Sequence, residues 1–128
     1  MDLKTYFETT TGLGVLSTAD SEGNVDSAVY ARPHVQEDGS LALIMRDRLS
    51  HKNLQSNPKA AYLFKEEGPG YTGRRFFLTK LREEQDEQKI DTLKRRSYPQ
   101  EDALHAEARY LVFFKIEKEL PLIGPGTE

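Results

Sequence analysis

Along most of this chain, apolar and polar residues alternate in short runs that predict β-strands. In the first part of the chain, strands are expected at residues 14–20, 25–35 and 40–46. Short turns rich in Gly, Asp and Asn separate these runs, which predicts an antiparallel meander of three neighbouring strands. The run 40–46, SLALIMR, is apolar almost throughout, as is typical of a strand buried on both faces. Pro33 has no N–H to donate, so the second strand is expected to be unpaired or bulged there.

Three more strands and three short helices complete the predicted elements. The strands are expected at residues 59–66, 74–84 and 109–120, and the helices at residues 2–10, 51–57 and 86–96. Leu3, Tyr6 and Phe7 fall on one side of the first helix at helical spacing. Strands of this length with small helices between them predict a mainly β fold, a six-stranded antiparallel β-barrel with α-helical caps. A length of 128 residues predicts one domain that covers residues 1–128.

Composition and charge narrow the classes of function. The formal net charge of −3 disfavours sequence-independent binding of nucleic acid, and the absence of cysteine excludes disulfides and thiolate metal sites. The three histidines, His34, His51 and His105, are too scattered to predict a metal site. The residues MDLKTYFETT lack an apolar signal core and no run reaches membrane-spanning length, so we expect a cytoplasmic protein without a membrane or nucleic-acid partner. A hydrophobic fraction of 37% is low for a free-standing domain and suggests that part of the core is shared across a subunit interface.

Positive charge gathers in the segment MRDRLSHKNLQSNP, residues 45–58, although the chain as a whole is negative. The residues concerned are Arg46, Arg48, His51 and Lys52. Ser50 occupies the expected N-cap position of the helix at residues 51–57. Cations near a helix N-terminus oppose the helix dipole unless an anion is bound there. The segment is therefore either a solvated surface turn or an anion site, and the planar fork of Arg matches a phosphate.

The order of these parts resembles the pyridoxamine 5'-phosphate oxidase-like superfamily of flavoproteins. A strand that ends in YARP, a turn, a buried strand and a loop with Ser, His and Lys are followed by KNLQSNPKAAYLF, the most characteristic string. The similarity covers roughly residues 14–80, and the segments FFLTKLREE and YLVFFKIEK also look like the small members of the group. The resemblance implies a split β-barrel of the FMN-binding type, with FMN held at a homodimer interface.

The resemblance also implies roles for particular residues. The strand that lies along the isoalloxazine ring in the family corresponds to Val29, Tyr30, Ala31 and Arg32, acting largely through backbone groups. The phosphate-binding loop of the family corresponds to Arg46, Ser50, His51 and Lys52, with Arg32 as a further candidate. The family often places a phosphate-binding Lys where this chain has Ser50, so the resemblance leaves open which side chain carries the charge.

The chain departs from the true oxidases of vitamin B6, which are longer and carry a C-terminal segment with Trp and Arg. This chain has no Trp and finishes with LPLIGPGTE. The resemblance therefore implies an FMN-binding oxidoreductase that passes hydride or electrons to a small substrate whose identity the sequence does not indicate. It implies no dedicated catalytic side chain, because the flavin ring carries the electron chemistry. The alternatives are a non-catalytic flavin-binding electron carrier, or the same barrel binding haem or a deazaflavin.

The loop GPGYTGRR, residues 68–75, has two interpretations. Its glycines permit close backbone approach, Tyr71 is suited to cover a planar ligand, and Arg74 and Arg75 are suited to contact an anion. In a dimer, this loop would reach the partner's flavin. The alternative is a hairpin loop whose two arginines are solvated.

Overall fold

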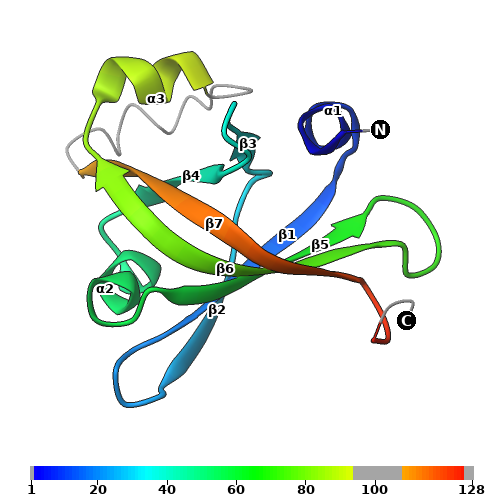
Figure 1. Ribbon diagram of the computed structural model, residues 1–128, viewed down its shortest axis with the longest axis horizontal. Helices are drawn as coiled ribbons and strands as arrows, with labels where there is room; N and C mark the ends of the chain where they lie inside the picture. The colour runs from blue at the N-terminus through cyan, green and yellow to red at the C-terminus, as the bar shows by residue number, and fades with distance from the viewer. Residues whose placement is uncertain (1, 94–107, 126–128) are drawn as a thin grey trace.

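The computed structural model describes residues 2–93 and 108–125. Its strands are β1 (Gly12–Ala19), β2 (Val25–Val29), β3 (His34–Val35), β4 (Leu41–Arg46), β5 (Lys59–Glu66), β6 (Gly73–Glu84) and β7 (Arg109–Pro121). Its helices are α1 (Leu3–Thr9), α2 (Leu49–Ser56) and α3 (Glu87–Leu93). Within this part of the chain, seven antiparallel strands form one sheet in the order β2-β1-β5-β6-β7-β4-β3 (Figure 1). The predicted mainly β fold with helical caps is confirmed, with seven strands in place of six.

The single strand expected at residues 25–35 is two strands in the structure. β2 pairs with β1, β3 pairs with β4, and residues 30–33 between them have no strand conformation. Pro33 lies in this connection, where its missing N–H removes no ladder hydrogen bond. The predicted three-strand meander is therefore wrong, because β2 and β4 lie near opposite ends of the strand order.

The placement of β2 and β3 forces the sheet to curl. Both are edge strands, yet residues 30–33 connect one directly to the other. A connection of this length spans less than about 20 Å even when fully extended. The two edges of the sheet must therefore approach each other, which bends the sheet into a barrel. α1 packs against β3 beside this connection (Figure 1).

Aromatic side chains from α1 and the strands fill the barrel. The Phe7 side chain is fully buried, and its ring lies edge-on to Tyr62 and Phe64, with ring centroids 6.3 and 5.4 Å apart. Edge-to-face contacts of this kind are favourable because the positive edge of one ring meets the negative face of the other. Asp2 caps α1 by accepting a hydrogen bond from the Thr5 N–H at 2.8 Å. The predicted N-terminal helix is thus confirmed.

β4 is buried on both faces, as its continuous apolar run predicts. One face enters the barrel core, and the other places Ala42 in a second apolar cluster that includes Ile90 of α3. The helix predicted at residues 86–96 is confirmed for Glu87–Leu93, and residues 94–96 lie outside the described residues. Among the helices of residues 2–93 and 108–125, none has the length and apolar character needed to cross a bilayer.

Candidate functional site

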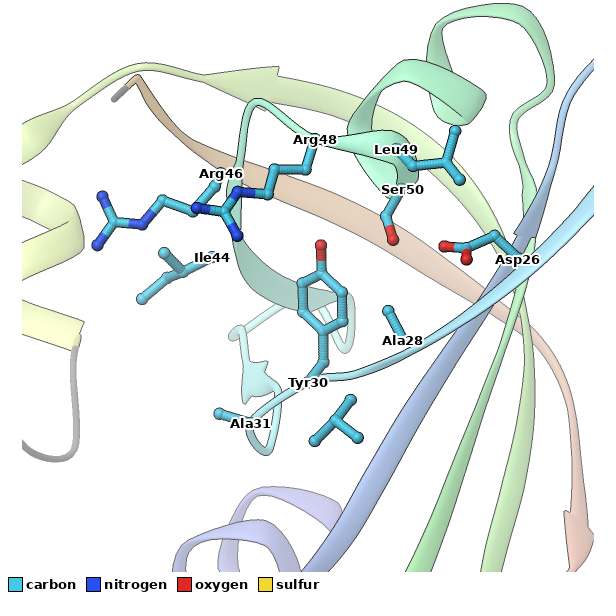
Figure 2. A pocket seen from close by; sticks show the side chains of 10 residues that line it. Asp26, Ala28, Tyr30, Ala31, Ile44, Arg46, Arg48, Leu49 and Ser50 are labelled. Carbon is cyan, nitrogen blue, oxygen red and sulfur yellow. The ribbon is translucent and has the colours of Figure 1, made fainter. Parts of the chain in front are cut away.

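A pocket of about 410 Å³ opens where β2, the end of β4 and the start of α2 meet (Figure 2). Small-molecule sites usually enclose roughly 300–1,000 Å³, so the volume suits a small organic ligand. The pocket is lined by Asp26, Ala28, Val29, Tyr30, Ala31, Ile44, Arg46, Arg48, Leu49 and Ser50. Its wall therefore combines small and apolar side chains with arginines and with the first residues of a helix.

The way in which α2 begins places Ser50 in the pocket wall. The N-cap of the helix is Arg48, which has an extended backbone (φ −129°, ψ −166°) and makes no side-chain cap hydrogen bond. The prediction that Ser50 is the N-cap is therefore wrong. The chain turns earlier, where the Arg48 N–H donates to the Arg46 carbonyl at 2.9 Å. Ser50 consequently lies in the first turn, where only 4% of its surface is exposed and it lines the pocket.

Tyr30 connects the two sides of the pocket. Its hydroxyl points toward the start of α2 (Figure 2). Burial is the main cause that raises the pKa of this hydroxyl, and the Asp26 carboxylate raises the pKa further. A hydrogen bond with the Ser50 side chain and the charge of Arg48 act in the opposite direction and lower the pKa in part. Tyr30 is therefore protonated at neutral pH, and its hydroxyl can both donate and accept hydrogen bonds.

Charges of both signs lie in the pocket wall. Arg46 and Arg48 bring two guanidinium groups, and Asp26 brings a carboxylate on the side of Ser50 (Figure 2). The first turn of α2 contains no acidic residue, so the positive end of the helix dipole adds to the arginines. Guanidinium groups match the oxygens of a phosphate, whereas a carboxylate repels phosphate and accepts hydrogen bonds from hydroxyl groups. The pocket therefore suits a ligand that carries both a phosphate and hydroxyl groups.

Solved structures with the same arrangement of strands identify the fold. An FMN-binding protein from Syntrophomonas wolfei subsp. wolfei matches with a TM-score of 0.75 at 18% sequence identity, over 95% of this chain and 84% of that chain. A protein from Lactobacillus delbrueckii named for pyridoxamine 5'-phosphate oxidase matches with a TM-score of 0.67 at 18% identity, over 94% of this chain and 92% of that chain. The fold is the pyridoxamine 5'-phosphate oxidase-like split barrel.

An F420 reductase has the same split barrel, with a TM-score of 0.68 at 12% identity over 93% of this chain and 97% of that chain. No family model and no curated protein sequence matches this chain. The sequence resemblance is thus confirmed at the level of the fold, by structures whose sequences are 12–18% identical to this one.

The split barrel brings most of the predicted cofactor-binding residues together. Those that line the pocket are Val29, Tyr30, Ala31, Arg46 and Ser50. Those that do not line it are Arg32, His51 and Lys52. That the first group binds a cofactor stays a prediction, and the surroundings of the second group indicate structural roles for Arg32 and His51.

Arg32 lies at the end of α1. Its Nη1 donates to the carbonyl oxygens of Phe7 and Thr10, at 2.9 and 3.0 Å. Carbonyl groups in the last turn of a helix lack partners within the helix, so a guanidinium group stabilises them. Arg32 therefore attaches α1 to the connection between β2 and β3, directly after Ala31 of the pocket wall.

His51 is buried on the side of α2 that faces β6 and β7. Its ring stacks on Tyr110, with centroids 3.8 Å apart and 14° between the ring planes. Its Nδ1 lies 3.3 Å from Asp47 Oδ1, and its Nε2 lies 2.9 Å from Glu83 Oε2. These contacts attach the first turn of α2 to the barrel. Lys52, the next residue, is exposed.

Glu83 is the centre of the polar cluster around His51. Partial burial alone would raise the pKa of Glu83, but hydrogen bonds from Lys80, Gln55 and His51 outweigh it and lower this pKa from 4.5 to about 2. Lys80 Nζ and Gln55 Nε2 contact the same carboxylate oxygen, Oε1, at 2.6 and 3.0 Å. The cluster is therefore held together by an ionised carboxylate.

Replacing Glu83 with Gln is expected to remove an acid-sensitive part of the stability. Because the pKa in the folded state lies below the unfolded value, ionised Glu83 stabilises the fold fully above pH 4.5, and this contribution is lost as the pH falls toward 2. A shift of this size corresponds to about 3 kcal/mol, and solvent screening of the partly exposed carboxylate lowers the contribution to about 2–3 kcal/mol. Urea unfolding at a series of acidic pH values should show a steeper loss of unfolding free energy in the wild type than in Glu83→Gln. Glu119→Gln, at an exposed position, is the control. If the unfolding free energy falls with pH equally steeply in the wild type and in Glu83→Gln, the stabilising role of ionised Glu83 is contradicted.

The arginines of the loop at residues 68–75 contact their own chain. The Arg74 guanidinium lies over the ring of Tyr6, 3.9 Å from its centroid. Arg75 Nε donates to the Pro121 carbonyl at 2.8 Å. Tyr71 remains exposed over 74% of its surface. These contacts let the arginines hold α1 and the end of β7, and a role of the loop at a partner's flavin stays a prediction.

Four pocket residues were not assigned to the site from the sequence: Asp26, Ala28, Ile44 and Leu49. Arg48 was predicted only as a member of the cationic segment. Three of the four could have been predicted from the alternation of side chains between the two faces of a strand. Asp26 and Ala28 lie on the same side of the chain as Tyr30, and Ile44 lies on the same side of β4 as Arg46. Nothing in the sequence distinguishes Arg48 from Lys52, because both are cations at the start of the same helix.

Proposed function

We propose that this chain is an FMN-binding flavoprotein that acts as an oxidoreductase, with FMN in the pocket between β2, β4 and α2. The observation that carries the proposal is that one pocket combines Arg46, Arg48 and Ser50 with a wall of small and apolar residues. A flavin nucleotide needs this combination, because a flat aromatic ring and a phosphate dianion belong to the same molecule.

The residues of the pocket fit the parts of FMN. Arg46, Arg48, the Ser50 hydroxyl and the N–H groups at the start of α2 would hold the phosphate. The Asp26 carboxylate would accept hydrogen bonds from hydroxyl groups of the ribityl chain. The residues 29–31 offer backbone groups and one aromatic side chain to the ring. The names of two solved split barrels, an FMN-binding protein and an F420 reductase, support a flavin-type cofactor.

The chain itself would bind and orient the cofactor, while bound FMN would supply hydride or electron transfer. Arg46 and Arg48 would hold the phosphate end of the ligand. The protonated Tyr30 hydroxyl points toward the start of α2 and is suited to donate a hydrogen bond at the phosphate end. A small substrate would reach the ring from the open side.

A homodimer with the flavin at its interface is part of the same proposal. Val29, Val15 and Leu63 are direct neighbours across β2, β1 and β5 on the outer face of the sheet. Val29 is 71% exposed and Leu63 37% exposed, so this row is an apolar strip open to solvent. Contiguous exposed apolar residues of this kind indicate a contact surface. Because Val29 also lines the pocket, a second copy seated on this strip would cover the mouth of the pocket.

The proposal is tested by titrating the cofactor-free protein with FMN and following the flavin fluorescence. We expect saturable binding that is at least about tenfold tighter for FMN than for riboflavin, because only FMN carries the phosphate that the arginines bind. Haem and a deazaflavin are titrated in parallel. Haem binding with a Soret band and no response to FMN would contradict the proposal, as would a failure of all flavins to bind.

A second measurement separates an enzyme from an electron carrier. The FMN-loaded protein is mixed with reduced nicotinamide in the absence of oxygen, and the visible absorption of the flavin is followed. Bleaching that repeats when an acceptor is added supports an oxidoreductase. A flavin that stays oxidised with NADH and NADPH but accepts electrons from a chemical reductant supports the non-catalytic carrier.

A further inference from the structure

The pocket wall is held from inside the barrel by one hydroxyl group. Tyr62 lies on β5 with its side chain fully buried, and its hydroxyl is within hydrogen-bond distance of the Tyr30 and Ala31 carbonyl oxygens, at 3.3 and 3.1 Å. Tyr30 and Ala31 line the pocket but belong to no strand. In a strand, these carbonyl groups would accept hydrogen bonds from the backbone of a neighbouring strand. Here the Tyr62 side chain is their donor instead.

Space for this hydroxyl exists because residue 14 on β1 is glycine. A Cβ atom at Gly14 would lie 1.9 Å from the Tyr62 hydroxyl oxygen and 2.6 Å from the Tyr30 carbonyl oxygen. Its φ is not in the left-handed region, so glycine is needed here for space and not for backbone conformation. The Gly14 carbonyl also accepts a hydrogen bond from the Tyr30 N–H at 3.0 Å. Gly14, Tyr62 and Tyr30 thus meet at one point beneath the pocket.

The geometry of the peptide bond relates this contact to the ligand side of the wall. In a trans peptide, a carbonyl group and the N–H of the next residue point in opposite directions. The Tyr30 carbonyl is turned toward Tyr62 inside the barrel. The Ala31 N–H is consequently turned to the other side, where Ala31 lines the pocket.

We propose that Tyr62 is a positioning residue for the pocket. By holding the carbonyl groups of Tyr30 and Ala31 inside the barrel, it keeps the Ala31 N–H directed toward a bound ligand. The inference rests on the proposed function, because the acceptor that would receive this N–H is an oxygen or nitrogen at the edge of the flavin ring. Gly14 supplies the space that makes the arrangement possible.

The test compares two variants that each lose one buried tyrosine hydroxyl. Tyr62→Phe is expected to weaken FMN and riboflavin by the same factor, about tenfold, because the wall loosens while the phosphate contacts remain. Tyr6→Phe is the control, since the Tyr6 hydroxyl donates to Glu66 Oε2 at 2.6 Å and Tyr6 does not line the pocket. Its affinity for both flavins is expected to equal that of the wild type.

Amide hydrogen exchange in the ligand-free protein keeps this inference separate from the proposed function. The Tyr30 amide, which is bonded to Gly14, is expected to exchange about tenfold faster in Tyr62→Phe than in the wild type or in Tyr6→Phe. If the Tyr30 amide exchanges faster in Tyr62→Phe but the affinity for both flavins is unchanged, Tyr62 has only a structural role and the inference is wrong. A loss of affinity for FMN but not for riboflavin would also overturn it. A wild type that binds no flavin would overturn the proposed function. In that case the exchange rate of Tyr30 alone decides whether Tyr62 holds the pocket wall, and an unchanged rate rejects it.

Discussion

Replacing Arg46 and Arg48 together by Gln is expected to weaken FMN binding by about 10²–10⁴-fold, because each charge-assisted hydrogen bond to phosphate contributes about 1.5–3 kcal/mol. Both residues line the pocket, and Gln keeps much of their length without the charge. Riboflavin lacks the phosphate, so its affinity is expected to stay at the wild-type value. Fluorescence titration with the two flavins measures both quantities, and circular dichroism confirms that the barrel is intact.

Lys52→Gln is the matched control for this double variant. Lys52 belongs to the same cationic segment and lies on α2, but it is exposed and does not line the pocket. Its replacement is expected to leave FMN affinity unchanged. If Lys52→Gln weakens FMN as strongly as the double variant does, the phosphate has been assigned to the wrong side chains. If the double variant loses riboflavin as well, the arginines act on the ring or on the fold instead.

Replacing Leu63 with Arg is expected to turn the proposed dimer into a monomer. Leu63 forms the β5 end of the apolar strip with Val15 and Val29. A charge buried there without a partner costs about 3 kcal/mol or more, roughly a hundredfold in the dimer dissociation constant. Light scattering during size-exclusion chromatography should give twice the chain mass for the wild type and the chain mass for the variant. FMN affinity is expected to fall with the dimer, because the strip adjoins the pocket through Val29.

Leu81→Arg serves as the control, since Leu81 is another exposed leucine, 50% accessible, on β6 and outside the strip. This variant is expected to remain a dimer with wild-type affinity. A wild type that is monomeric at the concentrations used for binding, yet binds FMN tightly, would remove the dimer from the proposal and leave the pocket unaffected.

The variants of the pocket have different expected signatures, so a single set of titrations separates them. The double arginine variant is expected to lose affinity for FMN but not for riboflavin. Tyr62→Phe is expected to lose affinity for both flavins by the same factor, and Leu63→Arg is expected to lose flavin affinity together with dimerisation. The difference follows from position. The arginines meet the ligand at its phosphate end, Tyr62 supports the wall from beneath, and Leu63 lies on the outer face of the sheet.

The order of elements along the chain was largely predictable from local patterns. The apolar run at residues 40–46 is buried on both faces, and the alternation at residues 59–66 becomes β5, because side-chain spacing within one strand depends only on neighbouring residues. Strand partners were not predictable in the same way. The pattern at residues 25–35 fits one strand as well as two, and only the closure of the barrel separates β2 from β3.

The candidate site shows the same division. Val29, Tyr30 and Ala31 lie in the pocket wall where the resemblance placed them, and Ser50 does so although it is not the helix N-cap. Arg32, by contrast, donates a hydrogen bond to a carbonyl group at the end of α1, although β1 and β2 lie between α1 and Arg32 in the sequence. Such a partner cannot be read from spacing, because the contact exists only once the helix is docked.

By itself, the sequence determined a mainly β domain with short helices, an apolar strand buried on both faces, and a cationic segment at a helix start. These features depend on residues that are close together along the chain. Only the tertiary structure decided that β2 and β3 lie at the two edges of the sheet, that His51 packs on Tyr110 near Glu83, and that the Tyr62 hydroxyl fits under Gly14. The physical reason is that each of these contacts joins groups distant in sequence, whose meeting depends on how the whole sheet curls.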